Sequence, residues 1–206
     1  MNRSLYNGPV ALGIGFVCVM IGTVIIGIWS FQLERIAASF PVIMAMQFNT
    51  ALCLVLLGIA FILSVFRHMA AVYVLSATTA VVAGSTLYQY TSGTTIGIDT
   101  LFIDPFVAVG ASAPGRMAPN TATCFLLTAA GISIPRINFA NYARLALGFA
   151  VVGIAAIALL GYAIHLDRAH DWVGSARMSP HTSFGFLFLG AGLIYLGAER
   201  GRGHFK

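Results

Sequence analysis

The sequence predicts an all-α fold, a polytopic membrane bundle of six transmembrane helices built as three helical hairpins. Hydrophobic residues make up 59% of the 206 residues and charged residues only 8%, whereas a soluble domain carries about 25% charged residues. A bilayer core about 30 Å thick requires about 20 apolar residues per helix. Six apolar runs of roughly this length, each bounded by polar or charged residues, account for most of the chain.

No Asp, Glu, Lys or Arg falls inside any of the six runs. Backbone groups cannot stay unpaired in lipid, so runs of this length are expected to be helices, and the alternating ten-residue segments of a barrel are absent. The first run is as long as a full span, so we interpret it as an uncleaved helix rather than a signal peptide. The six runs are Val10–Trp29, Met46–Phe66, Met69–Tyr90, Pro119–Ile134, Leu145–Ile164 and Ser179–Ala198.

Charge predicts the orientation of these spans. With six spans, both termini share one side with the connections 67–68 and 135–144, and this side carries seven basic residues: Arg3, Arg67, Arg136, Arg144, Arg200, Arg202 and Lys206. The other side has four basic and five acidic residues and the longer loops. The basic side, with both termini, is therefore expected to face the cytoplasm.

The net charge of +5 does not indicate a nucleic-acid partner, because basic residues cluster only in the last seven positions. The three cysteines are odd in number and lie in apolar runs, so they are expected to be packing residues rather than disulfides. Glycines recur at seven-residue steps, which we expect to serve internal helix packing. The partner that composition predicts directly is the lipid bilayer.

A short motif, Met-x-x-(Asn/His)-Thr-small, opens each even-numbered span from the outer side. Its copies begin at Met46, Met117 and Met178. Each copy follows an odd-numbered span and a longer loop, so the chain divides into hairpins near 10–66, 69–135 and 144–198.

The motif has two interpretations. Its polar residues can cap helix N-termini, where Asn, Ser and Thr are common. If the hairpins share an axis, the same residues would instead gather beside three positive helix ends, where a small anionic or polar ligand could bind. The candidate ligand-binding residues are Asn49, Thr50, Asn120, Thr121, His181 and Thr182.

The sequence predicts neither a metal site nor an enzyme, and it leaves any cofactor unknown. His165 and His170 lie in the HLDRAHDW loop and His181 lies beside it. This group could bind a metal weakly or sense protons, or it could simply belong to a solvated loop. Cys53 and Cys124 lie one turn deeper than the motif asparagines, but thiolate ligands normally come in tighter groups. No phosphate loop, nucleophile elbow or His-Glu metal helix is present in the sequence. Transporters usually carry ionisable residues at membrane depth, and none is found inside the six runs, so a transporter is not expected.

Two segments, Pro114–Ala122 and Ala176–Thr182, carry an Arg-Met-x-Pro-(Asn/His)-Thr pattern. With Gly97–Phe102 and Asn49–Leu52, this pattern resembles a membrane input module at the N-terminus of many bacterial sensor histidine kinases and diguanylate cyclases. The resemblance spans about residues 10–198 and implies a bacterial inner-membrane protein with a sensing or docking role. In such proteins a signalling helix and an output domain follow, whereas only Glu199–Lys206 follow here.

Two functional hypotheses remain open. The first is a non-catalytic sensory or signal-transduction module that acts through a partner membrane protein or complex. The second is a structural accessory subunit of a larger respiratory, photosynthetic or transport assembly. The oligomeric state is left open.

Overall fold

The fold is all-α, as predicted. The computed structural model describes residues 8–33, 46–104, 114–135, 138–164 and 177–198, without the side chains of 138 and 139. Within these ranges there are six α-helices and no strands. The helices are α1 (Gly8–Ser30), α4 (Phe48–Val65), α5 (Met69–Ser92), α6 (Pro119–Ser133), α7 (Asn138–Ala163) and α8 (Pro180–Ala198).

Five of these helices, all except α6, are long and apolar enough to cross a membrane. The chain is therefore a multi-pass membrane protein by length and composition. Helix α6 has 15 residues, which corresponds to a length of about 22 Å. It is shorter than the hydrocarbon core of a bilayer.

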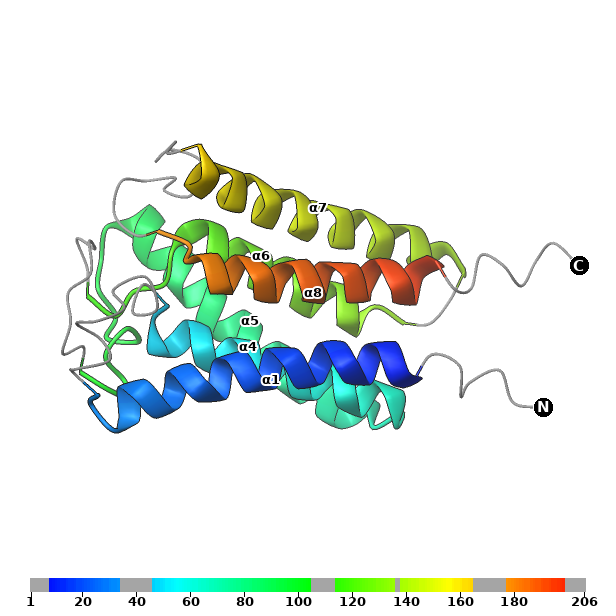
Figure 1. Cartoon of the computed structure of the whole chain (residues 1–206), viewed down its shortest axis with the longest axis horizontal. Coiled ribbons are helices and arrows are strands. Elements are labelled where there is room, and N and C mark those ends of the chain that lie inside the picture. The colour runs from blue at the N-terminus through cyan, green and yellow to red at the C-terminus, as the bar shows by residue number, and fades with distance from the viewer. Residues whose placement is uncertain (1–7, 34–45, 105–113, 136–137, 165–176, 199–206) are drawn as a thin grey trace, which may run out of the picture.

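The helices alternate in direction along the chain (Figure 1). Helices α1, α5 and α7 finish at the end of the bundle where α4, α6 and α8 begin, on the left of the view. We call this the motif end, because the three Met motifs lie there. The first residue of α1 and the last residue of α8 lie at the opposite end.

Contacts between helices follow a cyclic pattern. Helix α1 packs mainly along α4, α5 along α6, and α7 along α8. The three motif helices α4, α6 and α8 also contact one another, so they form an inner group. Each outer helix contacts the inner helix of a neighbouring pair as well, α1 with α8, α5 with α4 and α7 with α6. The three pairs thus surround a common axis.

Apolar side chains fill this inner group one to two turns below the motifs. Leu54, Phe125 and Phe186 each lie eight residues after a motif methionine, and all three are fully buried. The rings of Phe125 and Phe186 meet edge to face with centroids 4.7 Å apart. A Cβ on Gly185 would lie 3.0 Å from Leu54 Cδ1, so that contact is also tight. The centre of the bundle is a packed core at this depth.

Glycines bring the helices of two pairs into backbone contact. A Cβ on Gly15 would lie 2.6 Å from the Gly58 carbonyl oxygen, and a Cβ on Gly148 would lie 2.9 Å from the Gly190 oxygen. Only a residue without a side chain allows such an approach. The prediction that the seven-residue glycine steps serve internal packing is confirmed at Gly15 and Gly190, whose partners Gly58 and Gly148 were not part of that pattern.

One predicted helix start was wrong. Helix α7 begins at Asn138, not at Leu145, so Arg144 lies inside the helix rather than in a connection. Arg144 is only 3% exposed. It donates hydrogen bonds to the carbonyl oxygens of Gly131 (3.1 Å) and Ile134 (2.6 Å) and to Asn141 Oδ1 (3.1 Å). The charge is tolerated there because it binds carbonyl groups at the C-terminus of α6.

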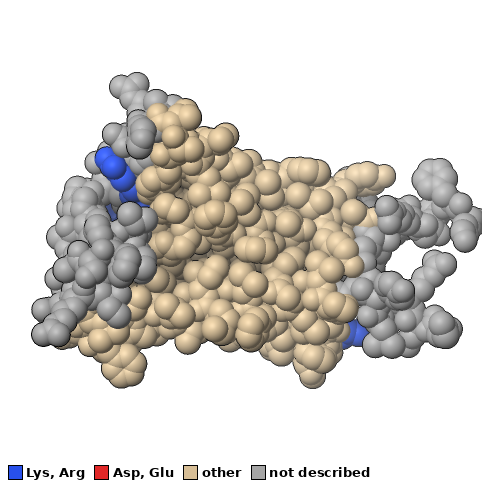
Figure 2. Space-filling view, viewed as in Figure 1, with Lys and Arg blue, Asp and Glu red and all other residues tan. Residues whose placement is uncertain are grey.

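The flank of the bundle carries no visible charge. In the view of Figure 2, described Lys and Arg side chains appear only near the two ends, and the surface between them is uncharged. Within the six helices, Arg144 is the one charged residue, and it is buried. Such a surface suits lipid contact.

Candidate functional site at the motif end

The three motif methionines have the same structural role. Each is almost fully buried, at 0%, 1% and 1% exposure for Met46, Met117 and Met178. The carbonyl oxygen of each accepts a hydrogen bond from an aromatic side chain near the C-terminus of the preceding outer helix. We call these three bonds the latches: Trp29 Nε1 to Met46 at 3.0 Å, Tyr90 Oη to Met117 at 3.2 Å, and Tyr162 Oη to Met178 at 2.9 Å.

The asparagines of the first two motifs, three residues after the methionines, make different hydrogen bonds. Asn49 is buried and donates from Nδ2 to the carbonyl oxygen of Ile98 at 2.8 Å. Asn120 is fully buried, and its Oδ1 accepts a bond from the Thr121 N–H at 2.9 Å. Thr50 and Thr121 are also buried. Asn49 therefore ties α4 to a loop, whereas Asn120 binds at the start of its own helix.

In the third motif a serine caps the helix. Ser179 Oγ accepts a bond from the Thr182 N–H at 3.3 Å and lies 2.6 Å from Thr182 Oγ1. His181 is half-buried, with Nε2 3.2 Å from Ser179 Oγ. The capping interpretation thus describes this motif well, through Ser179. It does not describe the first two, because the N-cap residues of α4 and α6, Gln47 and Ala118, make no side-chain capping bond. Ligand binding at the six predicted residues stays a prediction.

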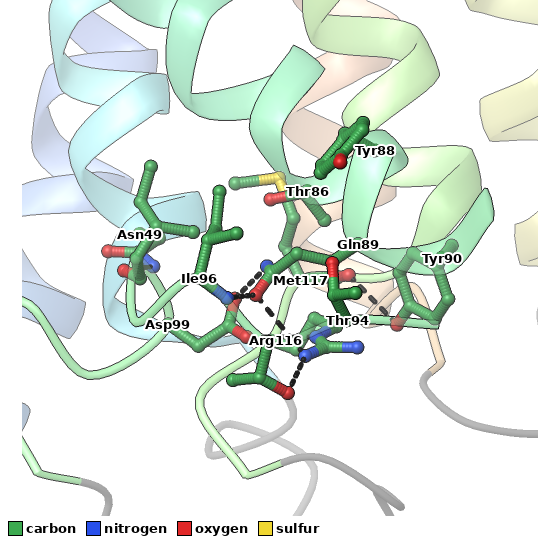
Figure 3. A network of polar contacts seen from close by, with 12 residues as sticks. Asn49, Thr86, Tyr88, Gln89, Tyr90, Thr94, Ile96, Asp99, Arg116 and Met117 are labelled. Carbon is green, nitrogen blue, oxygen red and sulfur yellow. Dashed lines mark hydrogen bonds and ion pairs between the residues drawn. The ribbon is translucent and has the colours of Figure 1, made fainter. Parts of the chain in front are cut away.

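Among the described residues at the motif end, the most concentrated polar cluster is a network of Gln89, Asp99 and Arg116 (Figure 3). Arg116 Nε lies 2.8 Å from Asp99 Oδ2 in an ion pair, and Gln89 Nε2 donates to Asp99 Oδ1 at 3.0 Å. Gln89 Oε1 accepts from Arg116 Nη2 at 3.3 Å and from the Ile96 N–H at 3.0 Å. All three side chains are buried, at 0%, 7% and 8% exposure respectively.

The network fixes the loop between α5 and α6 over the start of α4. Besides the Asn49 bond to Ile98, the ring of Phe102 packs against Phe48 with centroids 5.9 Å apart. Asp99 then connects the same loop to Arg116, directly before the second motif. The described part of this loop, residues 93–104, is therefore held by α4, α5 and the segment before α6.

Arg116 also contacts the second latch. Its guanidinium lies 5.4 Å from the centre of the Tyr90 ring, whose hydroxyl binds the neighbouring Met117 carbonyl. Gly115, at φ +80°, provides the left-handed turn before Arg116 that other residues rarely adopt. A change in the position of Arg116 would thus alter its contact with Tyr90, which forms the second latch. By contrast, Arg177, which precedes the third motif, is exposed.

This arrangement holds two opposite charges together in a buried site. A buried guanidinium paired with a carboxylate and an amide is neutral overall, and losing either charge would leave the other unpaired. No group of three or more His, Cys, Asp or Glu residues that could hold a metal occurs in the described part of the chain. Among the predicted candidates, His165 and His170 lie outside the described residues.

The network and the latches were not predicted. Asp99 and Arg116 were assigned to the outer side, but their pairing depends on a loop fold that spacing does not reveal. Gln89 was counted within an apolar run. One signal could have revealed the latches, since Gly15 and Gly148 each precede an aromatic residue by the same interval, Trp29 and Tyr162.

No family model, curated protein or solved structure matches this chain. The resemblance to a bacterial input module therefore stays a hypothesis.

Proposed function

We propose that the chain is a six-span, non-catalytic protein of a bacterial inner membrane, built as three hairpins with both termini in the cytoplasm. The motif end then faces outward. Support comes from the antiparallel pairs and from the charge asymmetry between the two sides. Helix α6 is shorter than the hydrocarbon core, so its C-terminal carbonyl groups would lie within the membrane. Arg144 donates hydrogen bonds to two of these carbonyl groups, so they are not left unpaired in lipid.

Within this topology the protein receives a signal at the motif end and passes it to a partner protein. The observation that carries this proposal is the buried Gln89–Asp99–Arg116 network. It fixes the loop between α5 and α6, which Asn49 ties to α4 of the first pair, and it contacts a latch. A ligand or partner that competes for either charge would therefore alter how the loop connects these two pairs. A signal can shift a conformational equilibrium only through such differential contacts.

The test uses the native bacterium. Deleting the chain is expected to change the phosphorylation of membrane histidine kinases or the cellular amount of cyclic diguanylate, the outputs that the resemblance implies. Wild type and Arg67→Gln, which alters an exposed arginine, should restore the normal value. Arg116→Gln and Asp99→Asn should fail to restore it when the variants are compared with wild type at equal amounts of chain in the membrane, since loss of the ion pair also lowers stability.

Purification in mild detergent distinguishes the second hypothesis. If deletion leaves both outputs unchanged, and the chain purifies in fixed stoichiometry with a respiratory, photosynthetic or transport complex, the sensory proposal is wrong. The chain is then an accessory subunit. An absorption spectrum of the same sample reports whether a pigment or haem is bound.

A further inference from the structure

The latches place the three outer helices in a common register. Counting back from each latch residue, the positions 14, 11, 7, 4 and 1 residues earlier are buried in all three helices. The three pairs can therefore be compared position by position. In α1 these positions hold Gly15, Cys18, Gly22, Ile25 and Ile28, and in α7 they hold Gly148, Val151, Ala155, Ala158 and Gly161.

The second pair differs at these positions. In α5 they are Ser76, Thr79, Ala83, Thr86 and Gln89, so four of the five carry a hydroxyl or an amide. The inner helix of the pair shows the same change, since Thr128 occupies the position of Leu57 in α4 and Leu189 in α8, eleven residues after the motif methionine. The shared packing does not require these polar groups, because two pairs do without them.

The polar side chains form a row across much of the helix. Ser76 and Gln89 are thirteen residues apart, which is about 20 Å along an α-helix. At the motif end the row meets the network through Gln89, which binds Asp99 and Arg116. We call Ser76, Thr79, Thr86, Gln89 and Thr128 the polar track.

Hydrogen bonding within the helices accounts for only part of the polar track. Thr79, Thr86 and Thr128 each donate to the carbonyl oxygen four residues earlier, at 3.0, 3.1 and 2.7 Å. Ser76 is 2% exposed, and its Oγ has no hydrogen-bond partner among the described residues. A buried hydroxyl is normally satisfied by protein or by water. The threonine oxygens also keep lone pairs that can accept further bonds.

We infer that the polar track binds water molecules along the buried face of α5, from the Gln89–Asp99–Arg116 network inward to Ser76. Water supplies the donor and acceptor that Ser76 lacks and bonds to the free lone pairs of the threonines. The ion pair at the motif end thereby gains a hydrated connection into the apolar part of the bundle. Hydration of the polar track does not depend on a signalling role of the protein.

A dry interface is the competing explanation. Hydroxyls in membrane helices also serve as contacts between helices, with no solvent present. The two explanations differ in whether solvent protons reach this face of α5 while the bundle stays folded. The equivalent face of α7 offers the matched control, because it has the same burial and register but no polar side chains.

The experiment measures exchange of a thiol proton with deuterium at matched sites. In full-length chain with Cys18, Cys53 and Cys124 replaced by alanine, and reconstituted in lipid nanodiscs, single cysteines are introduced as Thr79→Cys and Val151→Cys. Both positions are 0% exposed. The infrared S–H stretch is followed after transfer to D₂O buffer. A second matched pair, Thr86→Cys and Ala158→Cys, decides the question if a variant of the first pair does not fold.

Water in the polar track makes the thiol at Thr79→Cys exchange at least about tenfold faster than the thiol at Val151→Cys, because no opening of the bundle is needed. The second pair should show the same order. Equal slow rates in both members of a pair would mean a dry interface and would overturn the inference. Equal fast rates would show that the bundle opens generally, which also overturns it.

Discussion

The glycine crossing between α1 and α4 yields the sharpest stability prediction. A methyl group at Gly58 would lie 2.8 Å from the Gly15 carbonyl oxygen and 3.0 Å from the Val19 nitrogen. Both atoms belong to the backbone of α1, so rotating a side chain cannot relieve the contact. Gly58→Ala must therefore separate the two helices.

Two opposing terms set the magnitude. Overpacking a tight contact costs about 1–3 kcal/mol, whereas replacing glycine by alanine inside a helix gains up to about 1 kcal/mol. We expect Gly58→Ala to lower the free energy of unfolding by about 1–2 kcal/mol. The matched control is Gly153→Ala in α7, where a Cβ would meet no heavy atom within 4 Å. We expect Gly153→Ala to raise the free energy of unfolding by up to about 1 kcal/mol, because it gains helix propensity without a steric clash.

The assay is reversible unfolding in bicelles by increasing SDS, followed by tryptophan fluorescence. Trp29 is a suitable probe because its indole is 2% exposed and bonded to Met46. The two variants should differ by about 2–3 kcal/mol. If Gly58→Ala proves as stable as Gly153→Ala, the close approach of α1 and α4 is not present in the bilayer, and the packing argument fails.

Three further predictions use the same unfolding assay. Arg116→Gln should cost about 3 kcal/mol, because it leaves buried Asp99 without its cation. Arg67→Gln, at an exposed position, should cost under about 0.5 kcal/mol, and equal losses would contradict a structural ion pair. Tyr162→Phe should lower the free energy of unfolding by about 1 kcal/mol, because the Met178 carbonyl loses its donor. Tyr73→Phe, at an exposed position, should leave it unchanged. If Tyr162→Phe also leaves it unchanged, the latch does not contribute to stability. Arg144→Met should lower the free energy of unfolding by about 3 kcal/mol, because buried carbonyl groups at the end of α6 lose their donor. Arg67→Met, at an exposed position, should leave the stability nearly unchanged. A similar loss in both variants would indicate a general effect of removing a charge.

The helices were predictable because their signal is local. Lipid-length apolar runs bounded by polar residues place α1, α4, α5 and α8 to within a few residues. The start of α7 was missed because Arg144 was interpreted as a boundary, although a charge can lie inside a helix when another helix end supplies carbonyl oxygens. The spacing of glycines predicted close contacts but could not assign Gly15 to Gly58, since partner choice depends on tertiary packing.

The site was harder to predict because its parts are far apart in sequence. Asn49 binds Ile98, and Asp99 binds Arg116, through loop geometry that no periodicity encodes. The motif methionines form a repeat that the sequence shows, but each accepts its latch bond through the backbone carbonyl oxygen, which every residue has. Only the aromatic donors are specific, and they lie 17, 27 and 16 residues before the methionines, which hides the pattern.

Arg144 also has a consequence for the depth at which the bundle sits. Its guanidinium is fixed to the last carbonyl groups of α6 and cannot follow the interface by changing rotamer. In the proposed topology this charge lies toward the cytoplasmic boundary of the membrane, so sliding of the bundle toward the motif side would draw a fixed cation deeper into the membrane, which is unfavourable. The proposed topology therefore predicts resistance to piston-like movement in that direction, whereas tilting or rotation of the helices would leave Arg144 near the boundary.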